Sequence, residues 1–409
     1  MIEFLICLIG SILGTLLGLI PGSHINNILP FLLSFSFFLN PLQLSLFIIS
    51  ISTSQIISSY IPSIFLGAPN EENALSILPG HKLLLKGNGI SAIKIMITSS
   101  LLSTLFSFLL IAIFFNFFNF FYQISRNFVS ILILLTILIM ILIERKIKRI
   151  LLSSFIFLIS GIFGILALNF PLVNQNYILF PVLSGLFGIS TLINSLNEKP
   201  KIPKQNFNIK IDFNKKLIKS SFIGSIFGIL VGFLPAIGVS QAAIISQQIL
   251  RIKDELNFLA SLSSINVANE IFSLFAIYLI NNPRSGASIA IQRILTNISL
   301  YHLFLFSSSI LISLSISSLL SIKIAKRFVR IIEKIDYFKL NLIVLSYLLT
   351  SIFIFTGIYG LFLALISSSI GILAYKLGIK RSDCMGVLLI PSLLFFLKLN
   401  PIVYQILGI

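Results

Sequence analysis

Residues 10–27 read GSILGTLLGLIPGSHINN, and residues 224–241 read GSIFGILVGFLPAIGVSQ. Adding 214 to a residue number in the first stretch gives its counterpart in the second. The residues with identical counterparts are Gly10, Ser11, Ile12, Gly14, Leu16, Gly18 and Pro21. Serine, isoleucine and leucine match easily by chance in an apolar chain, but three glycines at four-residue spacing followed by a proline do not. The pattern therefore indicates an internal duplication.

The composition around these stretches sets the class of protein. Hydrophobic residues make up 57% of the 409 positions and charged residues 10%, and the mean hydropathy is +1.06. A soluble globular protein of this length needs far more polar surface. Several apolar runs reach the roughly 20 residues that cross a bilayer as a helix, and none alternates in the way of a membrane β-barrel strand. The sequence predicts an all-α, polytopic membrane protein.

The net charge of +17 does not indicate a nucleic-acid partner, because the basic residues cluster in short loops between apolar spans. Two distant cysteines, Cys7 and Cys384, predict neither a disulfide framework nor a thiolate metal site. The first 20 residues lack a basic start, and their copy recurs in mid-chain, so we interpret them as a retained membrane helix rather than a signal peptide.

The duplication divides the chain into a first membrane repeat at residues 1–194, a basic cytoplasmic linker at 195–219 and a second membrane repeat at 220–409. Each repeat offers about seven apolar segments, which gives about 12–14 membrane segments in all. Residues 61–89 form the most polar membrane-proximal part of the first repeat and read as a loop or re-entrant segment. A full membrane span is expected at residues 236–250.

Loop charge predicts how the two repeats are inserted. The basic residues 144–149 correspond to an uncharged stretch near 358–360, whereas the nearly neutral residues 122–127 correspond to the border of a basic loop at 323–339. The uncharged loop at 169–176 likewise maps near Lys380 and Arg381. Because basic loops stay in the cytoplasm, the repeats are expected to have inverted topology, with both termini outside.

The proline that ends each glycine-rich helix, Pro21 or Pro235, predicts a discontinuous helix. Backbone groups freed by a break must be shielded by protein or line an aqueous cavity, and paired breaks in inverted repeats mark substrate sites in transporters. The candidate substrate-binding residues follow the breaks: Gly22, Ser23, His24, Asn26, Asn27, Gly238, Ser240 and Gln241. Free N–H groups of a new helix there would favour an anion. The alternatives are simple helix packing for the glycines and local capping for the polar side chains.

A carboxylate inside an apolar run supplies the candidate for ion coupling. Most of the twelve acidic residues lie in or beside basic loops, but Glu270 lies within an apolar segment, where its charge needs a cation, a proton or a partner. A shift of 199 places Asn70 and Glu71 of the first repeat on Asn269 and Glu270. The coupling candidates are Asn266, Asn269, Glu270, Asn70 and Glu71. The alternative is an interhelical salt bridge to a residue such as Arg284.

Nothing in the sequence indicates an enzyme or a resident cofactor. The three histidines are isolated, and neither a metal-binding HExxH pattern nor a nucleotide-binding motif is present. We expect no metal site.

Three stretches resemble a known family: GTLLGLIPGSH, the loop FLGAPNEENALSILPGHKLLLKGNG and GILVGFLPAIGVSQAA. They are similar to the large membrane subunit of tripartite tricarboxylate transporters, in particular to divergent archaeal TctA-like proteins. The resemblance rests on these positions: Gly14, Gly18, Pro21, Gly22, Gly67, Pro69, Gly80, Lys86, Gly87, Gly228, Gly232, Pro235 and Gly238. It implies a permease for organic carboxylates, driven by a cation gradient and served by a small membrane subunit and an extracytoplasmic binding protein.

Together these features predict a secondary transporter in the cell membrane that moves a small organic anion, a carboxylate by preference, with H⁺ or Na⁺. The alternative is a non-transporting membrane scaffold or assembly subunit that keeps the permease fold.

Overall fold

The long helices of the computed structural model are apolar, as the sequence predicts. The structure describes residues 2–20, 25–68, 71–142, 146–175, 177–196, 203–207, 213–233, 238–250, 252, 254–295, 297–333 and 337–407, among which no strand occurs. Six helices there are long and apolar enough to cross a membrane: Pro41–Phe65, Gly89–Ile124, Ile147–Leu168, Glu255–Leu279, Leu300–Ile332 and Asn341–Lys376. The prediction of an all-α, polytopic membrane protein is confirmed.

The helices follow one another in a similar order in the two halves of the chain. The first half contains α1 (Ile2–Gly18), α2 (Ile25–Leu33), η1 (Ser34–Phe37), α3 (Pro41–Phe65), η2 (Glu71–Ser76), α4 (Ile77–Leu85), α5 (Gly89–Phe114), η3 (Phe115–Phe117), α6 (Phe118–Leu142), α7 (Ile147–Leu168), α8 (Leu179–Leu183), the π-helical turn η4 (Ser184–Ile189) and α9 (Ser190–Leu196). The second half contains α10 (Lys215–Phe233), α11 (Val239–Leu250), α12 (Glu255–Leu279), α13 (Gly286–Ile294), α14 (Leu300–Ile332), α15 (Tyr337–Lys376), η5 (Arg381–Met385), α16 (Gly386–Phe396) and α17 (Asn400–Leu407).

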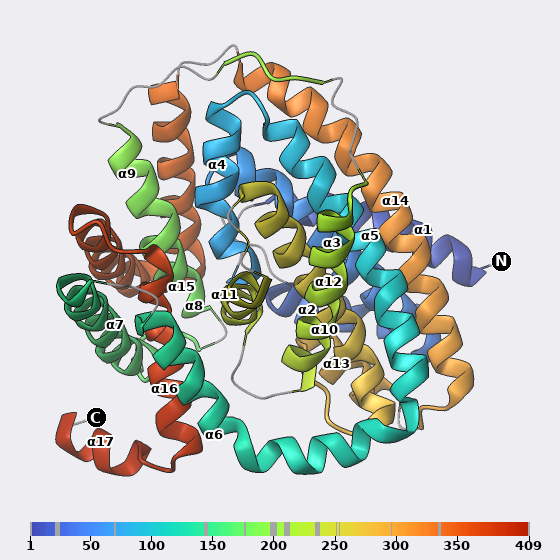
Figure 1. Cartoon of the computed structure of the whole chain (residues 1–409). Helices are drawn as coiled ribbons and strands as arrows, with labels where there is room; N and C mark the ends of the chain where they lie inside the picture. The colour runs from blue at the N-terminus through green and yellow to red at the C-terminus, as the bar shows by residue number, and fades with distance from the viewer. Residues whose placement is uncertain are drawn as a thin grey trace.

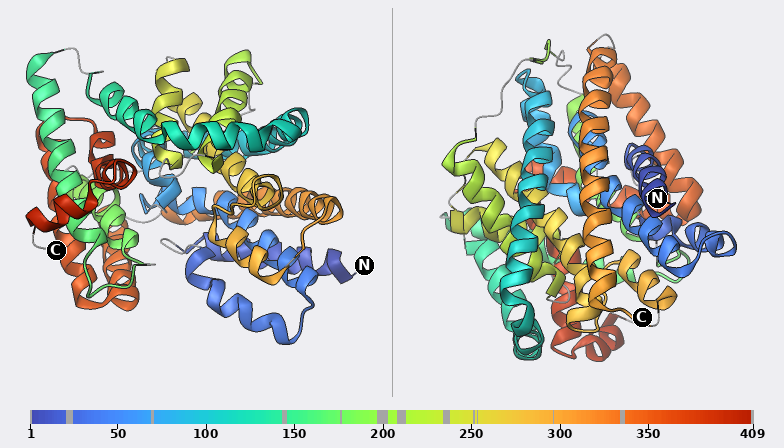
Figure 2. Two further views of the ribbon diagram at one scale, coloured as in Figure 1. Left: turned by 90° about the horizontal axis from the view of Figure 1, so that it is seen from below. Right: turned by 90° about the vertical axis from the view of Figure 1, so that its right-hand side faces the viewer.

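The helices gather into two groups that each draw on both halves of the chain. Helices α1, α3, α5, α10, α12 and α14 pack together on the right of Figure 1, and α7, α8, α9, α15 and α16 pack together on the left. Figure 2 shows the same separation from below, with the N-terminus and the C-terminus at opposite ends. Helix α6 runs along the lower edge between the groups, and the short helices α4 and α11 lie between them (Figure 1).

Equivalent helices of the two halves have equivalent packing partners. Helix α1 packs against α3 and α14, and its counterpart α10 packs against α12 and α5. Helices α3 and α12 occupy equivalent positions in the two halves, as do α5 and α14. Each contact joins one helix from each half, since α3 packs on α14 and α12 packs on α5. Small hydroxyl side chains link these helices in both sets, with Ser50 and Ser309 Oγ atoms 2.9 Å apart and Ser225 Oγ donating to Ser103 Oγ at 2.9 Å. Small polar residues allow close helix contact in a bilayer.

Several segments are shorter than a membrane crossing. Helix α2 has 9 residues and α11 has 12, so at 1.5 Å per residue they span about 14 and 18 Å against a hydrocarbon core of about 30 Å. The expectation of a full span at residues 236–250 is therefore wrong. The polar segment at residues 61–89, expected as a loop or a re-entrant segment, contains η2 and the nine-residue α4.

Two expected loops are helical. Residues 122–127 lie within α6, and the basic region that begins at residue 323 forms the last turns of α14 up to Ile332. Lysine and arginine are good helix formers, and their long side chains reach water from the end of a membrane helix, so a basic run there need not end the helix. The expected turn at residues 358–360 lies beside a kink in α15 at Gly357, whose φ is 65° and ψ is −162°.

The middle of the expected linker is anchored to both halves. The Gln205 side chain accepts a hydrogen bond from Gly89 N at 2.8 Å and donates to Leu84 O at 2.8 Å, while Gln205 N donates to Glu333 Oε1 at 2.7 Å. Helix α9 ends at Leu196 and α10 begins at Lys215. The division into two repeats with a linker at 195–219 stays a prediction.

Candidate functional site

Glycines bring the same two helices into close contact in each half. A methyl group on Gly14 of α1 would overlap the carbonyl oxygen of Ile51 on α3, and one on Gly228 of α10 would overlap that of Ile265 on α12. Gly228 lies 214 positions after Gly14, and Ile265 lies 214 positions after Ile51, so the contact is repeated as well as the motif. The glycines therefore pack helices, which is the simpler of the two roles that the sequence allows.

Glu270 lies where a helix of one half meets a helix of the other. Its side chain is 4% exposed on α12, and Ser52 Oγ on α3 donates a hydrogen bond to Glu270 Oε1 at 2.5 Å. A buried carboxylate costs several kcal/mol unless a proton, a cation or hydrogen-bond donors compensate its charge. The contact joins residues 218 positions apart.

Buried amides continue the polar cluster from α12 towards η2. Asn266 is 0% exposed, and its Nδ2 donates to Asn73 Oδ1 at 3.3 Å. Asn73 Nδ2 donates in turn to Ser59 Oγ at 2.7 Å. Asn266 Oδ1 has no hydrogen-bond donor among the described residues, and a buried carbonyl of this kind normally has a partner. A cation or a water molecule would supply one.

We define the coupling cluster as Ser52, Ser59, Asn73, Asn266 and Glu270. Its polar atoms include carboxylate, amide and hydroxyl oxygens, which are the ligands that hard cations prefer. The described residues contain no group of three or more histidine, cysteine, aspartate or glutamate residues that could hold a metal ion. The chemistry of the cluster fits a proton or an alkali cation.

The structure brings together two of the five predicted coupling residues. Asn266 and Glu270 belong to the coupling cluster, whereas the backbone of Asn269 lies against Gly228 and Gly232 of α10. Asn70 lies outside the described residues, as does the side chain of Glu71. Sequence reasoning missed Ser52, Ser59 and Asn73, because serine and asparagine are common in this chain and only tertiary contact distinguishes these three.

The second-half residues after the break lie at the start of α11. Gln241 Oε1 accepts a hydrogen bond from Gly238 N at 3.0 Å, which is the local capping contact that the sequence left as an alternative. Ser240 is 4% exposed, and its hydroxyl has no hydrogen-bond partner among the described residues.

The first break and its polar residues lie outside the described residues. This applies to Pro21, Gly22, Ser23 and His24, to the side chains of Asn26 and Asn27, and to Pro235 of the second break.

A family model for the tripartite tricarboxylate transporter TctA family matches residues 4–386. The chain belongs to this family. It is also 35% identical over 410 residues to an uncharacterised protein of Methanocaldococcus jannaschii, an alignment that covers 97% of this chain and 100% of the relative. No solved structure matches the chain.

TctA membership confirms the resemblance carried by the glycine-rich stretches, and it places the chain among transporter components of the membrane. As a TctA protein with long apolar helices, the chain contacts lipid. The TctA family is a family of transporters.

Proposed function

We propose that this chain is a secondary transporter that moves a small organic carboxylate across the cell membrane together with H⁺ or Na⁺. The observation that carries the proposal is Glu270, a buried carboxylate at the meeting of α3 and α12. A titratable group inside a membrane domain is a functional candidate by default, because burying it without a role costs stability.

The position of the coupling cluster supports the proposal. Ser52 comes from the first half and Glu270 from the second, so relative movement of the halves changes the number of oxygens around a bound ion. A cation that binds one arrangement better than the other shifts the equilibrium between them by its differential affinity. Such an ion couples its own gradient to the movement of a solute.

The exchange of packing partners between halves supports inverted repeats. Helices α3 and α14 form one contact and α12 and α5 form its counterpart, as a two-fold relation requires. With the loop charges, this relation favours opposite insertion of the halves and both termini outside. Single cysteines in residues 144–149 and 323–339 test it, because impermeant thiol reagents should label both from the same side. Labelling from opposite sides would overturn the inverted topology.

The family name describes a transporter of three parts. By extension, a small membrane subunit and an extracytoplasmic binding protein are proposed partners of this chain. If both are required, the chain alone takes up solute slowly, and adding the separate parts accelerates uptake.

Uptake into liposomes tests the proposed function directly. Purified chain reconstituted without other proteins should accumulate a radiolabelled carboxylate when a Na⁺ or H⁺ gradient is imposed, and collapsing the gradient with an ionophore should abolish accumulation. Liposomes without protein provide the control. Failure to accumulate any of a panel of carboxylates, with the candidate partners added, would favour the scaffold alternative.

A further inference from the structure

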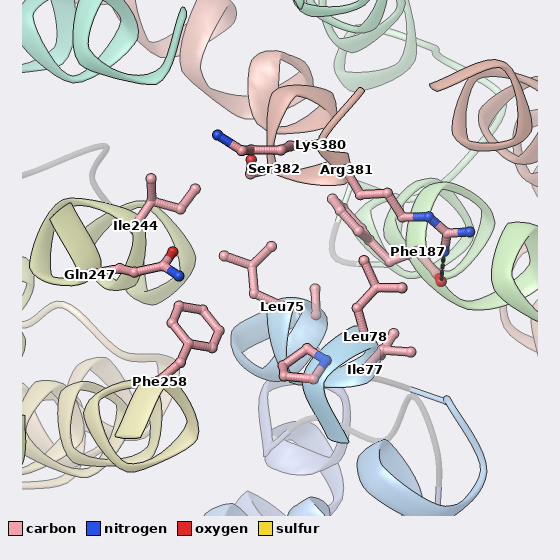
Figure 3. Close-up of a pocket in the computed structure, with 12 residues that line it drawn as sticks. Leu75, Ile77, Leu78, Phe187, Ile244, Gln247, Phe258, Lys380, Arg381 and Ser382 are labelled. Atoms are coloured by element: carbon pink, nitrogen blue, oxygen red, sulfur yellow. Dashed lines mark hydrogen bonds between the residues drawn. The ribbon is translucent and has the colours of Figure 1, made fainter. Parts of the chain in front are cut away.

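Basic side chains gather in two places outside the coupling cluster. In the first, Lys380 and Arg381 line a cavity of about 190 Å³ to which five parts of the chain contribute: η2 with the start of α4, η4, α11, α12 and the segment that begins η5 (Figure 3). Arg381 is already engaged there, because its guanidinium donates to Phe187 O at 3.3 Å and to Thr191 Oγ1. Lys380 likewise has a partner within the chain. The second place, the end of α14, differs because most of its cations have no such partner.

The last turns of α14 carry a row of cations on their outward face. Four basic residues follow one another at helical spacing on one side: Lys323, Lys326, Arg327 and Arg330. The buried residues of the same turns lie on the opposite side: Ser321, Ala325, Val329 and Ile332. Lys323, Lys326 and Arg327 form no ion pair and no hydrogen bond with any described residue. The neighbouring acid Glu333 is engaged by the linker, since its Oε1 accepts a hydrogen bond from Gln205 N at 2.7 Å. Three cations on one face are thus left for a partner outside the chain.

The neighbouring helix α5 adds a further cation at the same level. Lys94 Nζ donates to Phe207 O at 3.2 Å, and the guanidinium carbon of Arg330 lies 5.5 Å from the centre of the Phe207 ring. Phe207 therefore brings the start of α5 and the basic end of α14 together, and the charges of Lys94 and Lys326 are close enough to repel each other. An anion bound beside them would offset this repulsion, because attraction between opposite charges acts over the same distances.

The surface that continues from these cations is apolar and exposed. Helices α5 and α14 lie side by side on one outer face of the molecule (Figure 2, right), and both belong to the helices long and apolar enough to cross a membrane. On the sides that carry the cations, Leu319 of α14 is 66% exposed and Leu105 of α5 is 61% exposed. Leu319 precedes Lys323 by one helical turn, about 6 Å along the axis. The change from apolar to basic surface matches the order of acyl chains and head groups in one leaflet of a bilayer.

We infer that the adjoining ends of α5 and α14 bind an anionic phospholipid, with its phosphate among Lys323, Lys326 and Arg327 and an acyl chain along Leu319 and Leu105. Arginine binds phosphate oxygens through two parallel hydrogen bonds, and lysine adds a compact positive charge. A zwitterionic lipid binds more weakly, because its own ammonium group comes close to these cations. The lipid is favoured over an acidic protein or a nucleic acid because the basic face continues a surface that lipid already covers. This inference does not depend on the proposed transport function.

Native mass spectrometry of the full chain in detergent measures lipid binding directly. Dioleoylphosphatidylglycerol, which is anionic, should bind at least tenfold more tightly than dioleoylphosphatidylcholine, which is zwitterionic. A triple variant of α14 should reduce binding of the anionic lipid at least tenfold and leave that of the zwitterionic lipid unchanged: Lys323→Gln, Lys326→Gln and Arg327→Gln. Glutamine keeps the helix propensity of the residues that it replaces. The matched control removes three exposed lysines from the start of α10 and should change binding less than threefold: Lys215→Gln, Lys216→Gln and Lys219→Gln.

A second measurement covers the case in which the α14 variant fails to fold. The anionic lipid should raise the unfolding temperature of the unaltered chain more than the zwitterionic lipid does, and an increase in salt from about 0.1 M to about 1 M should remove most of the difference by screening. Equal binding of the two lipids, or equal loss of binding in the α14 and α10 variants, would overturn the inference. Stabilisation by inorganic phosphate or polyglutamate as large as that by the anionic lipid would also overturn it, because a soluble anion or an acidic chain would then be the preferred partner.

Discussion

The two glycine-packed helix pairs, α1 with α3 and α10 with α12, share their packing and differ in their chemistry. Gly14 meets Ile51 as Gly228 meets Ile265, and each contact maps onto the other through the same offset of 214. The two pairs differ, however, at the position of Glu270 on α12, because the equivalent residue of α3, 214 positions earlier, is Ile56. The two pairs are thus alike where they pack and unlike where they meet.

On the proposed duplication, this difference separates the packing that both copies share from the candidate site that only one copy carries. Backbone contact at the glycines tolerates no side chain, so both copies of the motif keep the residues that packing demands. The facing positions are free to differ, and Glu270 accepts a hydrogen bond across the interface from Ser52.

Filling the glycine contacts should have the largest effect, and an equal one in both pairs. Leucine at Gly14 or Gly228 would overlap backbone atoms of α3 or α12, which cannot give way as a flexible side chain can. Overpacking costs typically about 1–3 kcal/mol, and backbone overlap should exceed this and prevent recovery of folded protein. Size-exclusion chromatography in detergent measures the outcome. The control is Leu13→Ala on the outer face of α1, where Leu13 is 41% exposed. If only one of the two leucine variants failed to yield folded protein, the two helix pairs would not be equivalent in packing.

Placing a carboxylate in the first pair should have the next largest effect. Ile56 is buried at 8% exposure, and Ile56→Glu would add a second buried acid to the interface between the halves. We expect destabilisation by several kcal/mol, seen as a lower unfolding temperature at neutral pH, whereas Ile56→Leu should remain close to the unaltered chain. A stable Ile56→Glu variant would mean that the interface accepts charge in either half.

A dependence of stability on pH should come from α4, which lies outside the six long apolar helices. Burial lowers the pKa of His81 from 6.5 to about 4. Between these values the unfolded chain binds the proton and the folded chain does not, so stability falls as the pH falls from about 6.5 to about 4, by roughly 3 kcal/mol in all. His81→Gln should flatten this part of the curve of unfolding temperature against pH. An unchanged slope would assign the dependence to other groups.

Removing the amide of Asn266 should have a modest effect on stability and a large one on function. Asn266→Leu removes a buried carbonyl that has no donor among the described residues, but it also removes the Nδ2 that donates to the buried Asn73 Oδ1, so the free energy of unfolding should fall by about 1–3 kcal/mol. The concentration of coupling ion that gives half-maximal uptake should increase at least tenfold. Ser273→Ala, which removes a buried hydroxyl on α12 that has no hydrogen-bond partner among the described residues, is the control for packing. Equal ion dependence in the two variants would remove Asn266 from the ion site.

The sequence predicts the helical frame well and the site in part. The apolar run at 42–59 lies within α3 and the run at 256–280 nearly coincides with α12, because apolar length determines membrane helices directly. Glu270 stands out because its charge conflicts with its surroundings. The Ser52 contact depends on packing between residues 218 positions apart, and neither serine chemistry nor periodicity signals it.

Other features depend on the same long-range packing. The basic end of α14 is helical although its charges suggest a loop, since charge reports position relative to the membrane rather than backbone conformation. The cavity beside Arg381 is assembled from five separate parts of the chain, so no local motif marks it. Arg381 appears in the sequence only as one of the basic loop residues that indicate topology.

The role of Glu270 is tested most directly by comparing two modes of transport in the Glu270→Gln variant. Gradient-driven accumulation of a carboxylate and its exchange without a gradient are measured in the same liposomes, with protein folding checked by thermal unfolding. We expect accumulation to fall at least tenfold while exchange continues, because glutamine keeps the shape and hydrogen-bonding capacity of the side chain but binds neither the proton nor the charge of a cation. Accumulation at the level of the unaltered chain would contradict the coupling role.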